Sequence, residues 1–65
     1  MRISDLRERL ALSFGNDWVA SFCKDIAISN LNSTTVDEAL DSGIEADVIW
    51  KAVCKSHPKE TALYK

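Results

Sequence analysis

Residues 35–56 read TVDEALDSGIEADVIWKAVCKS, and this stretch decides the fold. Its start fits a capping box, in which the Thr35 hydroxyl and the Glu38 carboxylate each accept a hydrogen bond from the other residue's backbone amide. Gly43 follows where a left-handed residue commonly ends a helix, and Ile44 can then pack back onto that helix. The stretch therefore predicts a short helix, a tight turn at Gly43 and a second helix.

The second of these helices is expected over residues 46–56, because Pro58 stops it. At about 100° per residue, its apolar side chains cover an unusually wide arc. Ile49, Ala52 and Val53 share one face, and Val48 and Trp50 flank it on either side. A helix that is apolar around so much of its circumference is central to the fold, or it carries an interface as well as a core face.

Two more helices are expected in the first half of the chain. Leu6, Leu10 and Phe14 recur every four residues, with Ser4 as the N-cap and Gly15 as the stop. A second apolar stripe predicts a helix that begins near Asn16 or Asp17 and fades near residues 29–30; its members are Trp18, Val19, Phe22, Cys23 and Ile26.

The 65-residue chain is long enough for one domain only. We predict an all-α fold, a small bundle of three longer helices and one short helix, with the Gly43 turn between the last two. Residues 1–58 form the domain, and residues 59–65, which are polar apart from Ala62, Leu63 and Tyr64, are expected to be a frayed tail. No apolar run approaches the roughly 20 residues of a membrane span, and the charged start lacks a signal-peptide core. We therefore expect a cytoplasmic protein without a membrane association.

Several of these residues together resemble a bacterial family of very short proteins, domain of unknown function 3046. The resemblance covers about residues 1–56 and is most specific at Glu38-Ala39-Leu40-x-x-Gly43. Its other elements are Met1-Arg2, Phe14-Gly15 before Trp18, Asp25, Thr35, and Val48-x-Trp50-x-Ala52-x-Cys54. The resemblance implies a compact helical domain and assigns no activity. Family members tend to be encoded near recombination genes, which points to DNA metabolism.

The chain departs from the family pattern at three places. Ile26 stands where the family usually has His, and Ser33 and Thr34 stand where it usually has Gly and Arg. Pro58 comes earlier than the Val-Pro of the family, which affects the expected tail more than the fold.

A DNA-binding helix-turn-helix is one functional interpretation. Ala39, Gly43, Ile44 and Ile49 have the spacing of that motif, although any two helices joined by a tight Gly turn share it. The charges disfavour it, since residues 37–47 contain five acidic residues and no Lys or Arg. Phosphates need cationic partners there, and carboxylates at helix N-termini have a simpler explanation in the helix dipole. We therefore disfavour nucleic acid as a partner.

Other chemistry finds little support in the sequence. Lys51, Lys55 and Lys59 fall on one helical line beside Trp50, which could touch single-stranded nucleic acid but is ordinarily a solvated face. Cys54-x-x-His57 with Cys23 is one ligand short of a structural zinc site. Each Cys lies among apolar residues with no adjacent cationic cluster, so both are expected to be partly or fully buried, reduced and slow to react. We expect no enzyme activity, no cofactor, no metal and no small-molecule substrate.

A protein–protein contact remains as the favoured function, by elimination. Leu12 and Ile28 fall off the stripes of their helices, and Trp50 lies at the edge of a wide one, so each is either second-layer core or contact surface. With Lys51 and Lys55 they form the candidate interaction surface. We predict a non-catalytic interaction module whose partner is a second copy or another protein. The alternative is a nucleic-acid-binding accessory protein linked to DNA recombination or repair.

Overall fold

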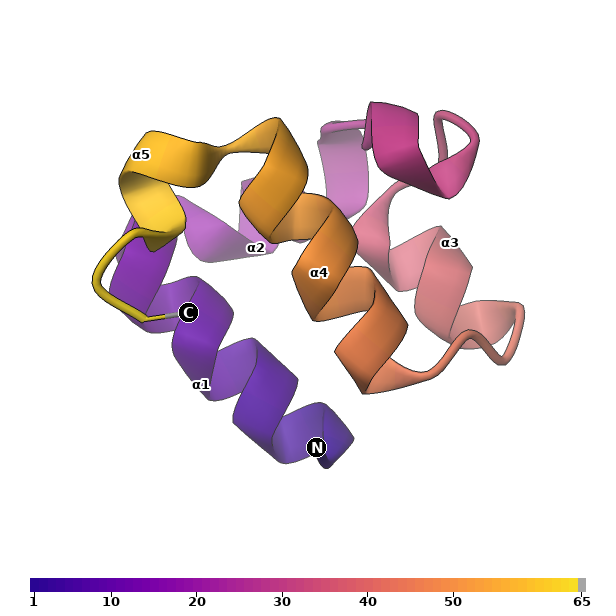
Figure 1. The fold of residues 1–65 in the computed structure, drawn as a ribbon, viewed down its shortest axis with the longest axis horizontal. Helices are drawn as coiled ribbons and strands as arrows, with labels where there is room; N and C mark the ends of the chain where they lie inside the picture. The colour runs from indigo at the N-terminus through magenta and orange to yellow at the C-terminus, as the bar shows by residue number, and fades with distance from the viewer. Residues whose placement is uncertain (65) are drawn as a thin grey trace.

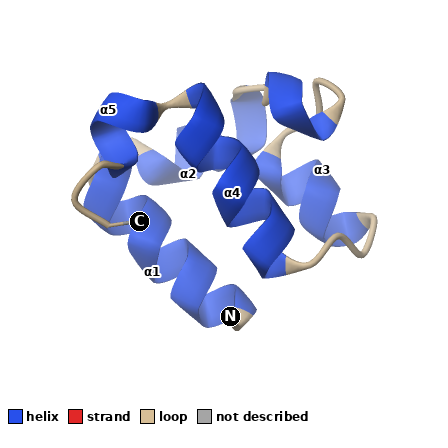
Figure 2. Ribbon diagram, viewed as in Figure 1, coloured by secondary structure: helices blue, strands red, loops and turns tan. Residues whose placement is uncertain are grey.

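The computed structural model describes residues 1–64, and its ordered elements are all helical (Figures 1 and 2). They are α1 (Ile3–Phe14), α2 (Val19–Asp25), the 3₁₀ helix η1 (Ser29–Leu31), α3 (Val36–Asp41), α4 (Ala46–Ser56) and α5 (Pro58–Thr61). The predicted all-α class is confirmed. Three longer helices were predicted, but only α1 and α4 are long, because α2 is shorter than predicted. The short helix α5 is an additional element that the sequence did not predict.

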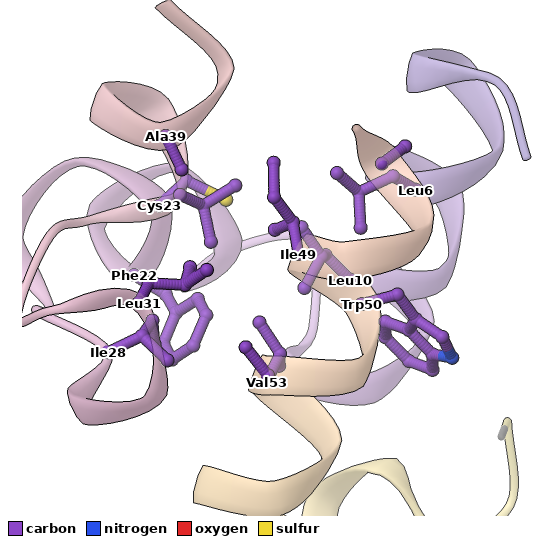
Figure 3. Close-up of a cluster of buried hydrophobic side chains, with 13 residues drawn as sticks. Leu6, Leu10, Phe22, Cys23, Ile28, Leu31, Ala39, Ile49, Trp50 and Val53 are labelled. Atoms are coloured by element: carbon purple, nitrogen blue, oxygen red, sulfur yellow. The ribbon is translucent and has the colours of Figure 1, made fainter. Parts of the chain in front are cut away.

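α4 is the central helix. It contacts α1, α3, α5 and η1, and in Figure 1 it crosses the middle of the molecule. Its buried side chains are Ala46, Ile49, Trp50, Ala52 and Val53. Figure 3 shows Ile49, Trp50 and Val53 of this set with apolar side chains from the surrounding elements, and all of them belong to one core cluster. The other labelled members include Leu6, Leu10, Phe22, Ile28, Leu31 and Ala39. The wide apolar arc of the sequence is therefore explained by core contacts on several sides.

The local signals around α3 are confirmed in detail. Glu38 N donates to Thr35 Oγ1 at 3.2 Å, and Thr35 N donates to a Glu38 carboxylate oxygen at 3.0 Å. Gly43 has a φ of +85°. Its amide donates to the Leu40 carbonyl at 3.1 Å, and the Ile44 amide donates to the Ala39 carbonyl at 3.1 Å. These two bonds make a Schellman motif, which turns Ile44 back toward the helix.

The N-terminal cap differs from the prediction. α1 begins at Ile3, so Ser4 lies inside the first turn and is exposed, and Arg2 takes the cap position. The reason is Asp5, whose carboxylate accepts from the Arg2 amide at 3.1 Å and moves the helix start toward the N-terminus. Gly15 ends α1 as predicted, with a φ of +86°, but its ψ of 145° is not that of a left-handed helical residue. A turn follows, in which the Gly15 carbonyl accepts from the Val19 amide at 2.9 Å.

The second helix is shorter than its apolar stripe. It begins after Trp18, which is 47% exposed, and neither Asn16 nor Asp17 caps it. It ends at Asp25, after which Ile28 and Leu31 turn into the core from the η1 segment. Asn32 and Ser33, with φ values of 57° and 62°, then reverse the chain toward Thr35. The burial of Ile28 and Leu31 was not predicted, because the surrounding Ser, Asn and Thr residues are typical of a loop.

After Pro58, where the sequence predicted a tail, the chain forms one more short helix and further core contacts. Pro58–Thr61 forms α5, Thr61 is completely buried, and Tyr64 packs against the core. The His57 ring lies edge-on to the stacked rings of Phe14 and Phe22, at centroid distances of 5.6 and 5.2 Å. These contacts hold the end of α4 against α1 and α2. Lys65, the last residue of the predicted tail, lies outside the described residues.

Candidate functional site

A pocket lies between α1 and α4, and three of its five lining residues are cationic. The lining residues are Arg9 of α1 and Trp50, Lys51, Cys54 and Lys55 of α4, around a cavity of about 380 Å³. We call it the α1–α4 pocket. Lys51 and Lys55 stand one helical turn apart, and Arg9 approaches from the other helix. Of the three lysines that the sequence placed beside Trp50, Lys51 and Lys55 line the pocket and Lys59 does not, and the structure adds Arg9 as a third cation.

Trp50 forms part of the core and part of this pocket. Its side chain is 5% exposed, and the Arg9 guanidinium lies 5.8 Å from the centroid of its ring. This is within the range of a cation–π interaction. In Figure 3 the indole nitrogen points away from the other labelled side chains. It forms no hydrogen bond with another of the residues 1–64. A donor is therefore left at the outer end of a buried ring.

Arg9 also lines a neighbouring hollow on the same face. Its other lining residues are Asp5, Glu8, Leu12 and Tyr64, around about 310 Å³. Leu12 is 55% exposed, as its position off the apolar stripe indicated. Arg9 therefore links Leu12 to Trp50, Lys51 and Lys55, and four of the five predicted surface residues lie on one continuous surface. Arg9 and Leu12 are three residues apart on α1, and this spacing indicates that they lie side by side. Only the fold brings Arg9 against Trp50.

Ile28, the fifth candidate, does not lie on that surface. It is completely buried, and its amide donates to the Thr34 carbonyl at 2.9 Å. The stripe of the second helix does not extend to Ile28, because that helix ends at Asp25. Ile28 is a core residue, and its assignment to a contact surface was wrong.

The two cysteines occupy different environments, and both are free thiols. Cys23 is buried, which raises the pKa of its thiol, and the carboxylate of Asp37 raises that pKa further, against an opposing effect of Arg7. Cys54 is only partly buried and shares the α1–α4 pocket with Arg9, Lys51 and Lys55. The prediction that neither Cys has cationic neighbours was wrong for Cys54, because Arg9 is distant in sequence and the two Lys lie on the adjoining helical face.

Several acidic residues of the 37–47 stretch have structural partners. Glu38 caps α3, and Asp37 accepts from the Arg7 guanidinium at 3.1 Å. Asp41 and Glu45 are exposed around the Gly43 turn, and Asp47 pairs with the chain's amino group at 3.3 Å. α3, the turn and α4 follow one another in helix-turn-helix order.

Among residues 1–64, no three His, Cys, Asp or Glu side chains gather closely enough to hold a metal ion. None of the helices from α1 to α5 has the length and apolar character needed to cross a membrane.

Comparison with known proteins gives a family and no closer relative. No curated protein and no solved structure matches the chain. One family model, described as protein of unknown function (DUF3046), matches residues 1–59, nearly the whole domain. This agrees with the pattern of Glu38, Gly43 and Trp50 in the sequence. The chain belongs to the DUF3046 family of proteins of unknown function.

Proposed function

We propose that this domain is a non-catalytic interaction module that binds an acidic segment of a partner protein in the bacterial cytoplasm. The proposed docking surface consists of Arg9, Leu12, Lys51 and Lys55. The observation that carries the proposal is the exposed Leu12 beside three cations gathered from two helices. Arg is enriched among the residues that dominate binding energy in protein interfaces, and Leu12 adds exposed apolar surface beside it.

Charge complementarity defines the partner's chemistry. None of Arg9, Lys51 and Lys55 has a carboxylate within ion-pair distance among residues 1–64, where the ion pairs involve Arg7 and the chain's amino terminus. A partner segment with an apolar side chain to contact Leu12 and acidic side chains to pair with the three cations would complement this surface. Such complementarity acts mainly on association rate and specificity.

A protein partner is favoured over duplex DNA because of the acidic residues that surround these cations. Asp5 and Glu8 line the hollow beside Arg9, and Asp47 lies one turn before Lys51 on α4. A duplex laid across this face would bring phosphates against carboxylates as well as lysines. A short acidic segment can contact the cations alone. The DNA-accessory alternative therefore stays second.

Site-specific photo-cross-linking in the native host tests the proposal. A photoreactive phenylalanine replaces Leu12 in one variant and Ala20, an exposed residue of α2, in the matched control. We expect a discrete cross-linked protein from position 12 and none from position 20. The purified partner should then bind the domain at least about tenfold more weakly after Lys51→Glu and Lys55→Glu together. Equal products from both positions, or an unchanged dissociation constant, would contradict the proposed surface.

A further inference from the structure

We propose that the α1–α4 pocket is also a binding site for a phosphate group carried by a small organic molecule. This goes beyond the docking function, because it concerns the isolated domain and needs no partner protein. The two share cations, so an occupied pocket would compete with an acidic partner segment. The site is defined by Arg9, Trp50, Lys51 and Lys55, with Cys54 in its wall.

The polar groups around this pocket are all hydrogen-bond donors. Arg9 offers a planar fork of N–H groups, and Lys51 and Lys55 offer ammonium groups. The Trp50 side chain adds one indole N–H, which forms no hydrogen bond with another of the residues 1–64. No carboxylate is among the lining residues. A carboxylate ligand has two oxygens and a single charge, whereas a phosphate monoester has three terminal oxygens and up to two charges. Three cations and one further donor match the phosphate better.

The donors are partly fixed before any ligand arrives. Arg9 is half-buried and held over the Trp50 ring, and Trp50 itself is fixed by the core. Lys51 and Lys55 project from adjacent turns of the most deeply packed helix. Pre-organised donors lose less conformational entropy on binding, so a small anion can be held without a large contact area. The cavity of about 380 Å³ also falls within the usual range of small-molecule sites.

The surroundings favour a small ligand over a nucleic-acid strand. A strand that left the pocket would bring its next phosphate toward Asp5 and Glu8 on one side or Asp47 on the other. The Trp50 side chain, at 5% exposed, offers no free face on which a base could stack. A single phosphate with a compact organic body, packed on Cys54 and the aliphatic parts of the lysines, avoids both difficulties.

Amide and indole NMR spectra of the isolated protein at low ionic strength test this site. The probes are inorganic pyrophosphate, adenosine 5′-monophosphate and a ten-nucleotide oligothymidylate. The chain has two tryptophans, so the Trp18 indole serves as an internal reference for the Trp50 indole. We expect a saturable shift of the Trp50 indole resonance with pyrophosphate and with the mononucleotide, and little change at Trp18.

Matched charge-neutral variants decide whether the site is specific. The test variant carries Lys51→Gln and Lys55→Gln, and the control carries Lys24→Gln and Lys59→Gln, which replace exposed lysines outside the pocket. Loss of charged hydrogen bonds should weaken binding about tenfold or more in the test variant, and less than about twofold in the control. All four positions are exposed, so both variants should keep the thermal midpoint of the native protein.

Three outcomes would overturn the inference. The first is no saturable shift of the Trp50 indole with either small phosphate. The second is equal weakening in the test and control variants, which indicates diffuse charge attraction. The third is markedly tighter binding of the oligothymidylate than of the mononucleotide, which would assign the cations to a nucleic acid. If the NMR test fails while cross-linking from position 12 succeeds, the phosphate site is refuted and the proposed docking surface stands. The two proposals can therefore fail independently.

Discussion

At the scale of single residues, neighbours determine the chemistry of identical side chains. Cys23 and Cys54 both lie on apolar helical stripes, yet the first is sealed in the core and the second shares a pocket with three cations. The environment of Ser13 is unfavourable, since its Oγ is buried without a hydrogen-bond partner among the described residues. Burial of a polar atom in this way costs stability, so the core is not optimised at every position.

Cys23 should react with iodoacetamide far more slowly than Cys54 in the native protein. Burial and the nearby Asp37 carboxylate raise the pKa of the Cys23 thiol, so little thiolate forms, and the surrounding core excludes the reagent. Mass spectrometry of labelled peptides should show Cys23 protected at least about 100-fold relative to denatured protein. A Cys54→Ser variant isolates the Cys23 rate. Similar rates for the two thiols in native protein would refute this account.

Ser33→Gly should stabilise the protein by about 1 kcal/mol. Ser33 has a φ of 62°, which a residue with a Cβ rarely adopts and which glycine adopts freely. Urea denaturation measures the gain, and Asn32→Gly is the matched control. Asn tolerates positive φ better than Ser, so the control should gain less. A loss of stability in Ser33→Gly would remove the strain argument.

At the scale of elements, α3 is a helix that its ends define. It has six residues, too few to be stable alone, but its N-terminus carries a complete capping box and its C-terminus a Schellman motif. The turn at the C-terminal end of α3 sets the direction in which α4 crosses the core. α2 has no side-chain cap and a shorter extent than its apolar stripe, so its bounds follow from packing against α1 and α3.

Gly43→Ala should cost about 1 kcal/mol or more, and Thr35→Ala about 1 kcal/mol. A Cβ built on Gly43 meets no atom within 4 Å, so the cost comes from the φ of +85° alone. Gly43→Asn should therefore lose less than Gly43→Ala, because Asn tolerates that conformation. Chemical denaturation midpoints of the three variants provide the measurement. Unchanged midpoints in both Ala variants would exclude this turn-and-cap account.

At the scale of the whole molecule, α4 is the helix against which most of the other elements pack. The described chain spans only 26 × 23 × 19 Å, so one central helix reaches nearly every other element. Small domains bury a low fraction of their surface, and each large core side chain then carries a large share of the stability. Trp50 is the largest of these on α4, and it also supports the cations of the α1–α4 pocket through Arg9.

Trp50→Ala should cost about 3 kcal/mol or more of folding free energy, because it removes a large buried side chain from between α1 and α4. The matched control is Trp18→Ala, which removes the same side chain from a position that is 47% exposed and should cost much less. Thermal or urea denaturation of both variants compares them. Small and equal losses would show that Trp50 is a surface residue and reopen its interpretation as a protein contact.

The sequence by itself determined the all-α class, the α3 cap, the stops at Gly15 and Gly43, and the central role of the last long helix. These features depend on residues within about four positions of one another, where hydrogen bonds and helical periodicity act locally. Only the tertiary structure decided that Ile28 and Thr61 are buried, that the residues after Pro58 form α5, and that Arg9 meets Trp50. Those outcomes depend on which helix faces meet, and packing between distant segments leaves no periodic signal in the chain.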